Sequence, residues 1–272
     1  MGYLCLHPRR KPEQIRLGHK HMDHKRVDLF GCQIDSLTMD ETVDLIEKYI
    51  RERVPKQHVV VNVAKIVAMQ KDSKLRAIIN SCDLVNADGM PIVWASRILG
   101  DPLPCRVAGV DLFQRLVQLS AEKGYRPFFF GAREEIVTRV AEIFKEKYPG
   151  LDVAGLRNGY FSEDEEPEIV RTVRESKAYM IFVAFSSPKK EKFLNKWMPT
   201  MQVPFCMGVG GSFDVVAGVT RRAPLWMQRC GMEWFYRILQ EPGRMWKRYA
   251  TTNPVFLWMV LRAFFTERRV RG

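Results

Sequence analysis

Short apolar runs alternate with longer segments of helical periodicity along most of the chain. The apolar runs, which predict buried strands, lie at residues 27–29, 59–61, 84–85, 127–130, 151–154, 179–185 and 205–209. The helical segments lie at about 39–50, 66–69, 91–99, 109–123, 134–148, 162–176 and 189–197. Thr38 with Glu41 is a capping box at the start of the first helix. The alternation predicts an α/β fold with a mostly parallel sheet covered by helices on both faces.

After Pro224 the pattern is helical without strands. We expect Pro242 and Pro254 to divide this part into about three helices, because proline breaks a helix interior. The apolar stretch Val255–Leu261 is interrupted by Arg262. About twelve helical residues span roughly 18 Å, against roughly 30 Å of bilayer hydrocarbon. We therefore predict an α/β core over 27–220 and an all-helical, membrane-associating appendage over 221–272 that lies in one leaflet.

Positive charge is concentrated at the two ends of the chain. Of the net charge of +12, residues 1–26 contribute +5 and residues 220–272 contribute +8, which leaves the middle at −1. Residues 1–26 are expected to be a flexible basic leader. Four of the six tryptophans also lie in the C-terminal end. Cations mixed with aromatic rings suit an anionic membrane surface and also single-stranded nucleic acid, so composition leaves both partners open.

Composition and short motifs exclude several classes of protein. A chain of 272 residues that is 46% hydrophobic can bury a core, which excludes wholesale disorder. The six cysteines show no framework spacing, and no apolar signal segment is present, so we expect a reducing, cytoplasmic compartment. Asp-x-Asp, His-Glu-x-x-His and P-loop motifs are absent from the sequence, so a metal-chelating nucleotide-sugar site of the Asp-x-Asp kind and a nucleoside triphosphatase are not indicated. We expect no metal and no cofactor.

A glycine-rich segment, Gly208–Asp214, follows the last predicted strand. Glycines let the backbone approach a diphosphate closely, and free amides there can bind its oxygens. A carboxylate one turn later can hold a ribose hydroxyl. The spacing differs from the dinucleotide fingerprint, and a plain strand-to-helix turn explains the glycines equally well.

Three further polar positions follow predicted strands or loops. Asp88 ends a strand, where a carboxylate can serve as a general base or cap the next helix. The segment Ser186–Glu191 fits helix capping, or phosphate capture by Lys189 or Lys190. Arg106 follows a proline-rich loop and can pair with a phosphate through two nitrogens, or be a surface charge.

Together these motifs resemble the WecG/TagA/CpsF glycosyltransferases, glycosyltransferase family 26. The resemblance runs from about Val27 to the C-terminal region. Its motifs are Asn86–Trp94, Arg106–Leu112, Asn158–Phe161, Ser187–Glu191, Gly208–Asp214, Arg222–Pro224, Glu233–Arg237 and Glu241–Arg244. The resemblance implies inverting, metal-independent transfer of a sugar from a UDP-sugar to a polyprenyl-diphosphate-linked saccharide. The expected location is the cytoplasmic face of the bacterial plasma membrane, in teichoic acid, capsule or exopolysaccharide synthesis, with a peripheral appendage that completes the active site.

Site residues follow from the resemblance position by position. Asp88 becomes the general base for the acceptor hydroxyl, and Asn62 lies beside the donor pocket. Arg106 contacts the diphosphate or the sugar. The UDP is held by Gly210, Gly211 and Asp214. Arg237, Arg244 and Lys247 bring positive charge from the appendage to the leaving UDP or the acceptor diphosphate, since a reaction without metal needs cations there.

The chain departs from the family pattern at three positions. The family usually has threonine at Val60, glycine at Ser186 and glutamine at Lys190. We hypothesise that Lys190 contacts the diphosphate or an acidic group on the donor sugar. The sequence does not identify that sugar: N-acetylmannosamine, its uronate and glucose all stay open. Two functions stay open as alternatives to a glycosyltransferase: a non-catalytic binder of lipid-linked glycan, and a nucleic-acid-binding protein that uses both basic ends. If the protein is a glycosyltransferase, we expect no nucleic-acid partner.

Overall fold

The computed structural model describes residues 24–271, and most of the predicted leader therefore lies outside the described residues. The described chain begins with an antiparallel pair, β1 (Arg26–Leu29) and β2 (Cys32–Asp35). The turn between them places Gly31 at φ 79°, a left-handed conformation that suits glycine. The sequence pattern predicted β1 but missed β2, whose buried Asp35 interrupts the apolar pattern.

The main sheet has six parallel strands in the order β4-β3-β8-β7-β5-β6. Their bounds are β3 Lys56–Val61, β4 Leu84–Ala87, β5 Pro127–Gly131, β6 Gly155–Arg157, β7 Met180–Ala184 and β8 Phe205–Gly208. The parallel sheet confirms the α/β prediction. The expected strand at 151–154 is wrong in position, because β6 pairs with β5 only from Gly155 onward.

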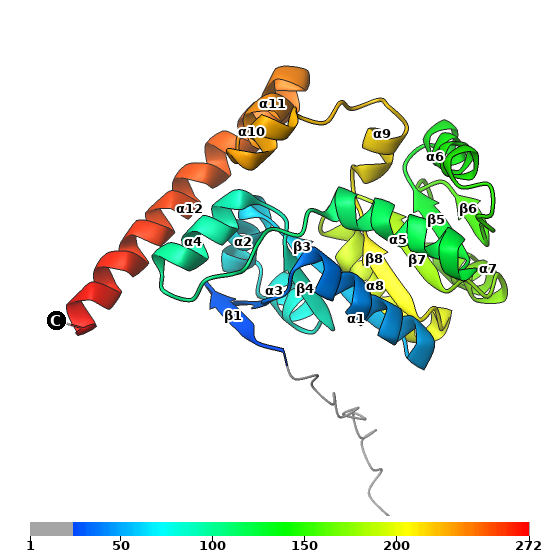
Figure 1. Cartoon of the computed structure of the whole chain (residues 1–272), viewed down its shortest axis with the longest axis horizontal. Helices are drawn as coiled ribbons and strands as arrows, with labels where there is room; N and C mark the ends of the chain where they lie inside the picture. The colour runs from blue at the N-terminus through cyan, green and yellow to red at the C-terminus, as the bar shows by residue number, and fades with distance from the viewer. Residues whose placement is uncertain (1–23, 272) are drawn as a thin grey trace, which may run out of the picture.

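Helices cover both faces of this sheet (Figure 1). One face carries α1 (Met39–Glu52), α5 (Gly109–Lys123) and α6 (Glu134–Lys147). The other carries α2 (Val63–Lys71), α3 (Ser73–Asn80), α4 (Met90–Ile98), α7 (Glu166–Glu175, after the 3₁₀ turn Glu163–Glu165) and α8 (Lys189–Met201). The sequence pattern did not predict α3.

Local sequence explains where several helices begin and end. The predicted capping box at α1 is present: the Glu41 amide donates to the Thr38 hydroxyl at 3.3 Å, and the Thr38 amide donates to the Glu41 carboxylate at 2.8 Å. Helix α5 spans the predicted residues and ends at Gly124, whose φ of 70° closes the helix in the left-handed conformation.

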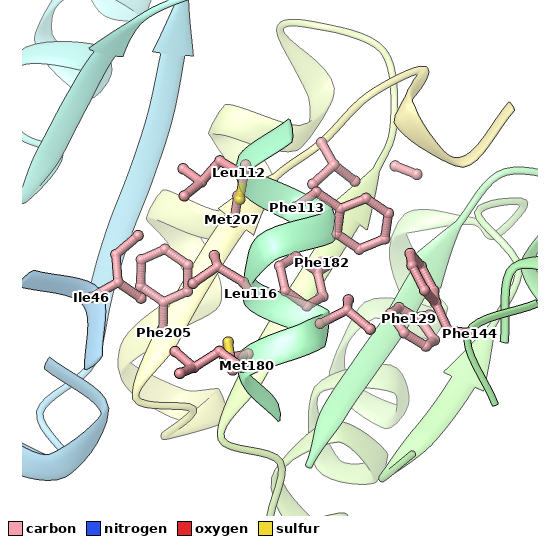
Figure 2. Packing of buried hydrophobic residues seen from close by; sticks show 14 of the residues in the cluster. Ile46, Leu112, Phe113, Leu116, Phe129, Phe144, Met180, Phe182, Phe205 and Met207 are labelled. Atoms are coloured by element: carbon pink, nitrogen blue, oxygen red, sulfur yellow. The ribbon is translucent and has the colours of Figure 1, made fainter. Parts of the chain in front are cut away.

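Strand side chains alternate between the two cores. Phe129 and Phe182 point toward α5, while Phe128 and Ile181 pack with α7 and α8 on the other face. Figure 2 shows the first core, in which Phe113 of α5 meets Phe182 edge-on at 4.7 Å between ring centroids. Such close aromatic packing fixes α5, and therefore the loop before it, against the strands.

The chain ends in α9 (Ser212–Val216), α10 (Leu225–Arg229), α11 (Glu233–Gln240) and α12 (Pro242–Arg271). Helix α12 runs along the side of the molecule that holds α2 and α4 (Figure 1). Phe256 and Val260 of α12 are buried in the core formed with α2, and Phe256 meets Phe30 edge-on at 5.8 Å. We call α10, α11 and α12 the C-terminal helices.

The prediction that Pro254 breaks a helix is wrong, because Pro254 lies inside α12. An interior proline costs about 3 kcal/mol. Burial of Phe256 and Val260 against the core offsets that cost. Within residues 24–271, each helix is too short or too polar to cross a bilayer.

Candidate active site

Four adjacent strands end at one edge of the sheet and bring most of the predicted site residues there. Asn62 follows β3, Asp88 follows β4, Lys190 lies in the first turn of α8 after β7, and Gly210 follows β8. Since β4, β3, β8 and β7 are neighbours and parallel, their carboxyl ends lie side by side. Ligands of open parallel sheets bind at this edge.

Asp88 is half-buried at the end of β4. Its amide donates to the Val61 carbonyl at 2.8 Å, and its carboxylate Oδ1 accepts from the Gly109 amide at 2.9 Å. The carboxylate thus binds the amide of the first residue of α5. The alternative role of Asp88, as a cap of the next helix, would place this contact at the start of α4. The N-cap of α4 is instead Gly89, which has no side chain to form such a bond. Burial raises the pKa of Asp88.

Charged residues of the C-terminal helices act on the same carboxyl. Glu233 adds to the rise in the pKa of Asp88, while Arg237 and Arg106 oppose it. Burial also raises the pKa of Tyr249, on which Arg237 and Asp88 act as well. The Tyr249 ring lies 5.9 Å from that of Trp234. Arg237 of α11 therefore lies close enough to Asp88 to lower its pKa, and its predicted role toward the diphosphate stays a prediction.

Arg106 is held by the C-terminal helices. Its Nη1 donates to Glu233 Oε2 at 3.0 Å and its Nη2 donates to Gln228 Oε1 at 2.9 Å. Arg222 donates to both carboxylate oxygens of Asp111 and lies 3.9 Å from Glu233. The sequence pattern did not predict Gln228 and Glu233 as partners of Arg106, although Glu233 begins one of the motifs of the resemblance.

Two predicted cations lie on α12. Lys247 is exposed in the first part of the helix. Arg244 lies in the first turn of α12, and its side chain is outside the described part of the structure. Their proposed contact with a diphosphate stays a prediction.

Asn62 caps α2, because its side-chain oxygen accepts from the Lys65 amide at 3.1 Å. Val60 packs against the start of α5: a Cβ on Gly109 would lie 3.2 Å from Val60 Cγ2. Val60 therefore contributes to packing beside Asp88.

Lys190 is buried and its side chain lies across the end of β8. A Cβ on Gly208 would lie 2.8 Å from Lys190 Cδ, so a larger residue at this position would displace the lysine side chain. Gly210 has φ 53°, and a Cβ there would lie 3.8 Å from Lys190 Nζ. The Lys190 ammonium thus ends beside the glycine-rich turn. The Lys189 side chain points elsewhere, because its ammonium lies 4.0 Å from the Phe161 ring centroid.

Asp214 lies in α9, directly after the same turn. A Cβ on Gly211 would be 3.8 Å from Asp214 Oδ2, and the Asp214 carbonyl accepts from the Thr220 amide at 3.0 Å. Gly210, Gly211 and Asp214 therefore lie together after β8, and their contact with UDP stays a prediction. Among residues 24–271, no group of three or more histidine, cysteine, aspartate or glutamate side chains is placed to hold a metal ion.

Comparison with known proteins gives a consistent result. The model of the family described as "Glycosyl transferase WecG/TagA/CpsF family" matches residues 27–270. One relative is the N-acetylglucosaminyldiphosphoundecaprenol N-acetyl-beta-D-mannosaminyltransferase of Bacillus spizizenii (strain ATCC 23059 / NRRL B-14472 / W23), 35% identical over 195 residues, or 72% of this chain and 74% of the relative. The protein of the same name from Bacillus subtilis (strain 168) is 32% identical over 207 residues, or 76% of this chain and 80% of the relative.

Proposed function

Because the chain belongs to the WecG/TagA/CpsF family of glycosyltransferases, we propose that it moves a sugar from a UDP-sugar to a polyprenyl-diphosphate-linked saccharide. The family predicted from the sequence motifs is confirmed, and with it the activity class of glycosyltransferase. The names of both relatives describe transfer of N-acetylmannosamine onto N-acetylglucosaminyldiphosphoundecaprenol, which supports a lipid-linked acceptor. We place the reaction in synthesis of a cell-surface polysaccharide such as teichoic acid, capsule or exopolysaccharide.

The observation that carries the proposal is the position of Asp88. Its carboxylate lies at the carboxyl end of β4, held by the Gly109 amide, with Arg237 of α11 acting on it across the edge of the sheet. In our mechanism Asp88 accepts the proton of the acceptor hydroxyl while that oxygen attacks the anomeric carbon. One displacement of this kind inverts the configuration at the anomeric carbon.

The leaving UDP carries negative charge away from the anomeric carbon, and cations must stabilise it. In our proposal the amides of Gly210 and Gly211 bind the diphosphate, and Asp214 accepts from a ribose hydroxyl. Arg237, Arg244 and Lys247 add positive charge from the C-terminal helices. We propose a reaction independent of metal because these side chains supply the positive charge that the leaving UDP needs.

The exposed surface of the C-terminal helices supports peripheral membrane association. Trp246, Leu257, Leu261 and Phe265 recur at helical spacing on α12 and are exposed, with Trp258 beside them. The Arg262 guanidinium lies 5.3 Å from the Trp258 ring centroid. An exposed aromatic and aliphatic face beside cations is typical of a helix that lies in the interface of an anionic membrane. We propose that this face docks on the cytoplasmic surface of the plasma membrane.

The first test measures UDP release from a panel of UDP-sugars, with a polyprenyl-diphosphate-monosaccharide acceptor in anionic vesicles. We expect acceptor-dependent release with one donor, survival of the activity in a chelator, and loss in Asp88→Asn. Absence of release with every donor, from folded protein bound to the vesicles, would contradict the catalytic proposal and favour a binder of lipid-linked glycan.

A further inference from the structure

A buried cluster of three charged side chains lies under the glycine-rich turn. Lys65 of α2 donates to Glu191 Oε1 at 2.8 Å and to the Val60 carbonyl at 2.8 Å. Lys190 Nζ lies 3.2 Å from the same Glu191 oxygen. We call Lys65, Lys190 and Glu191 the lysine–glutamate cluster. The side chains are 7%, 9% and 2% exposed, respectively, so all three are largely withdrawn from water.

The cluster holds one more cation than anion when both lysines are protonated. Burial and Lys65 lower the pKa of Lys190 to about 8, against the attraction of Glu191. Arg248 of α12 acts on Lys190 in the same direction as Lys65. Burial alone would raise the pKa of Glu191, but the two lysines lower it to about 2, so the carboxylate is ionised at neutral pH. A buried net charge is costly unless a ligand balances it.

The cluster also has hydrogen-bonding capacity directed at the turn. An ammonium carries three donors, and Lys190 Nζ ends near Gly210 at the start of the segment that we assign to UDP. Glu191 Oε2 is buried and accepts no hydrogen bond from any residue of the described chain. A ligand that brings an anionic oxygen to Lys190, together with a hydroxyl for Glu191, would satisfy both groups.

We propose that Lys190, backed by Lys65, binds an anionic oxygen of the nucleotide-sugar donor, and that Glu191 accepts from a hydroxyl of the same donor. This inference rests on the proposed function and names the feature of the donor that the site selects. Two parts of the donor carry such an oxygen: the diphosphate, and a carboxylate if the sugar is a uronic acid.

The test measures binding of uridine, UDP, a UDP-N-acetylhexosamine and a UDP-hexuronate by calorimetry, with full-length protein. The variants are Lys190→Gln and Lys190→Met; the latter keeps an unbranched stem over Gly208. Lys192→Gln is the matched control, because Lys192 is exposed two residues further along the same helix. Circular dichroism and the melting temperature verify that each variant folds.

The pattern of losses identifies the anionic group. If Lys190 binds the diphosphate, both Lys190 variants lose about tenfold or more in affinity for UDP and both UDP-sugars, with uridine unchanged. If it binds a sugar carboxylate, only the UDP-hexuronate loses affinity. Folded Lys190 variants whose affinities all stay within about twofold of the wild type, with wild-type protein binding UDP-sugars, would overturn the inference and leave the proposed function standing.

A separate probe distinguishes failure of the proposed function. Inorganic pyrophosphate and glucuronate are tested for stabilisation of the wild type and of Lys190→Met against heat. If these anions stabilise the wild type but not Lys190→Met, and the wild type binds no UDP-sugar, the anion site stands and the UDP-sugar donor is rejected. If wild-type protein binds neither the nucleotides nor these anions, both proposals are wrong.

Discussion

The Arg106 guanidinium donates to the Glu233 carboxylate at 3.0 Å across 127 positions of the chain. This ion pair joins the loop between α4 and α5 to α11, and Gln228 binds the second terminal nitrogen of Arg106. The contact places Arg237, one turn further along α11, on the same side of the sheet as Asp88. In this structure Arg106 therefore positions the C-terminal helices, and its predicted contact with the diphosphate stays a prediction.

Breaking this pair should loosen the C-terminal helices. We expect Arg106→Gln to raise hydrogen exchange in α10 and α11 and to lower kcat/KM about tenfold or more, because Arg237 is then less well positioned. Exchange measured by mass spectrometry separates this effect from loss of a direct contact. Unchanged exchange with lowered kcat/KM would instead indicate that Arg106 acts on the substrate.

Asp88→Asn should remove the general base while leaving donor binding nearly intact. We expect kcat to fall about 10²–10⁴-fold, with the affinity for UDP within about threefold of the wild type. Asp152→Asn is the control, because Asp152 is an exposed carboxylate that pairs with Arg126 at the surface. A kcat of Asp88→Asn within threefold of the wild type would exclude Asp88 as the base.

The rate should fall in acid at a pH above the ordinary aspartate value. A general base must be deprotonated, and burial raises the pKa of Asp88 above 3.8. Activity is therefore present at high pH and is lost as the pH falls through the raised pKa. A profile of kcat/KM against pH locates this limb, and a midpoint at or below 3.8 would contradict the assignment.

Donor binding should weaken in alkaline solution. The pKa of Lys190 is lowered to about 8, so its positive charge is lost as the pH rises through that value. Lys65, Glu191 and Arg248 face the group, and an anionic ligand favours its protonated form. We expect the affinity for a bound UDP-sugar to fall above about pH 8 in the wild type, and Lys190→Gln to remove this dependence. Calorimetry from pH 6.5 to about 9.5 checks it.

Removing the charge of Glu191 should destabilise the fold. Glu191→Gln leaves two buried lysines without a counter-charge, and loss of one partner of a buried ion pair costs about 3–5 kcal/mol in the free energy of unfolding. Adding Lys65→Met should recover part of the loss. Urea denaturation of the single and double variants measures both values, and an unfolding free energy of Glu191→Gln equal to the wild type would contradict the buried pairing.

Vesicle binding should depend on the exposed face of α12. Leu257→Ser with Leu261→Ser removes apolar side chains that are 58% and 47% exposed, so we expect weaker binding to anionic vesicles at unchanged stability. Val54→Ser is the control, since Val54 is similarly exposed at the end of α1. Cosedimentation measures the binding, and equal losses in both proteins would argue against a specific docking face.

Much of the fold could be predicted because its signals are local. Helix α5 lies at the predicted residues 109–123, where apolar positions recur every three to four residues and a glycine follows. The signal failed for β2, in which buried Asp35 accepts from the Val85 amide at 2.6 Å. It failed again at Pro254, where packing of α12 against the core outweighs the local preference of proline.

The sequence by itself determined the family, the order of most strands and helices, and the residues that follow most strands, because helical periodicity, caps and motifs depend on residues close together in the chain. Only the tertiary structure decided that Lys65 pairs with Glu191 across 126 positions of the chain. It also decided that Arg106 pairs with Glu233 and is not a solvated surface charge. Such contacts depend on the spatial order of the strands and on how α11 and α12 return to the sheet edge. Local patterns do not encode that order, because contacts between distant segments arise from packing of the whole chain.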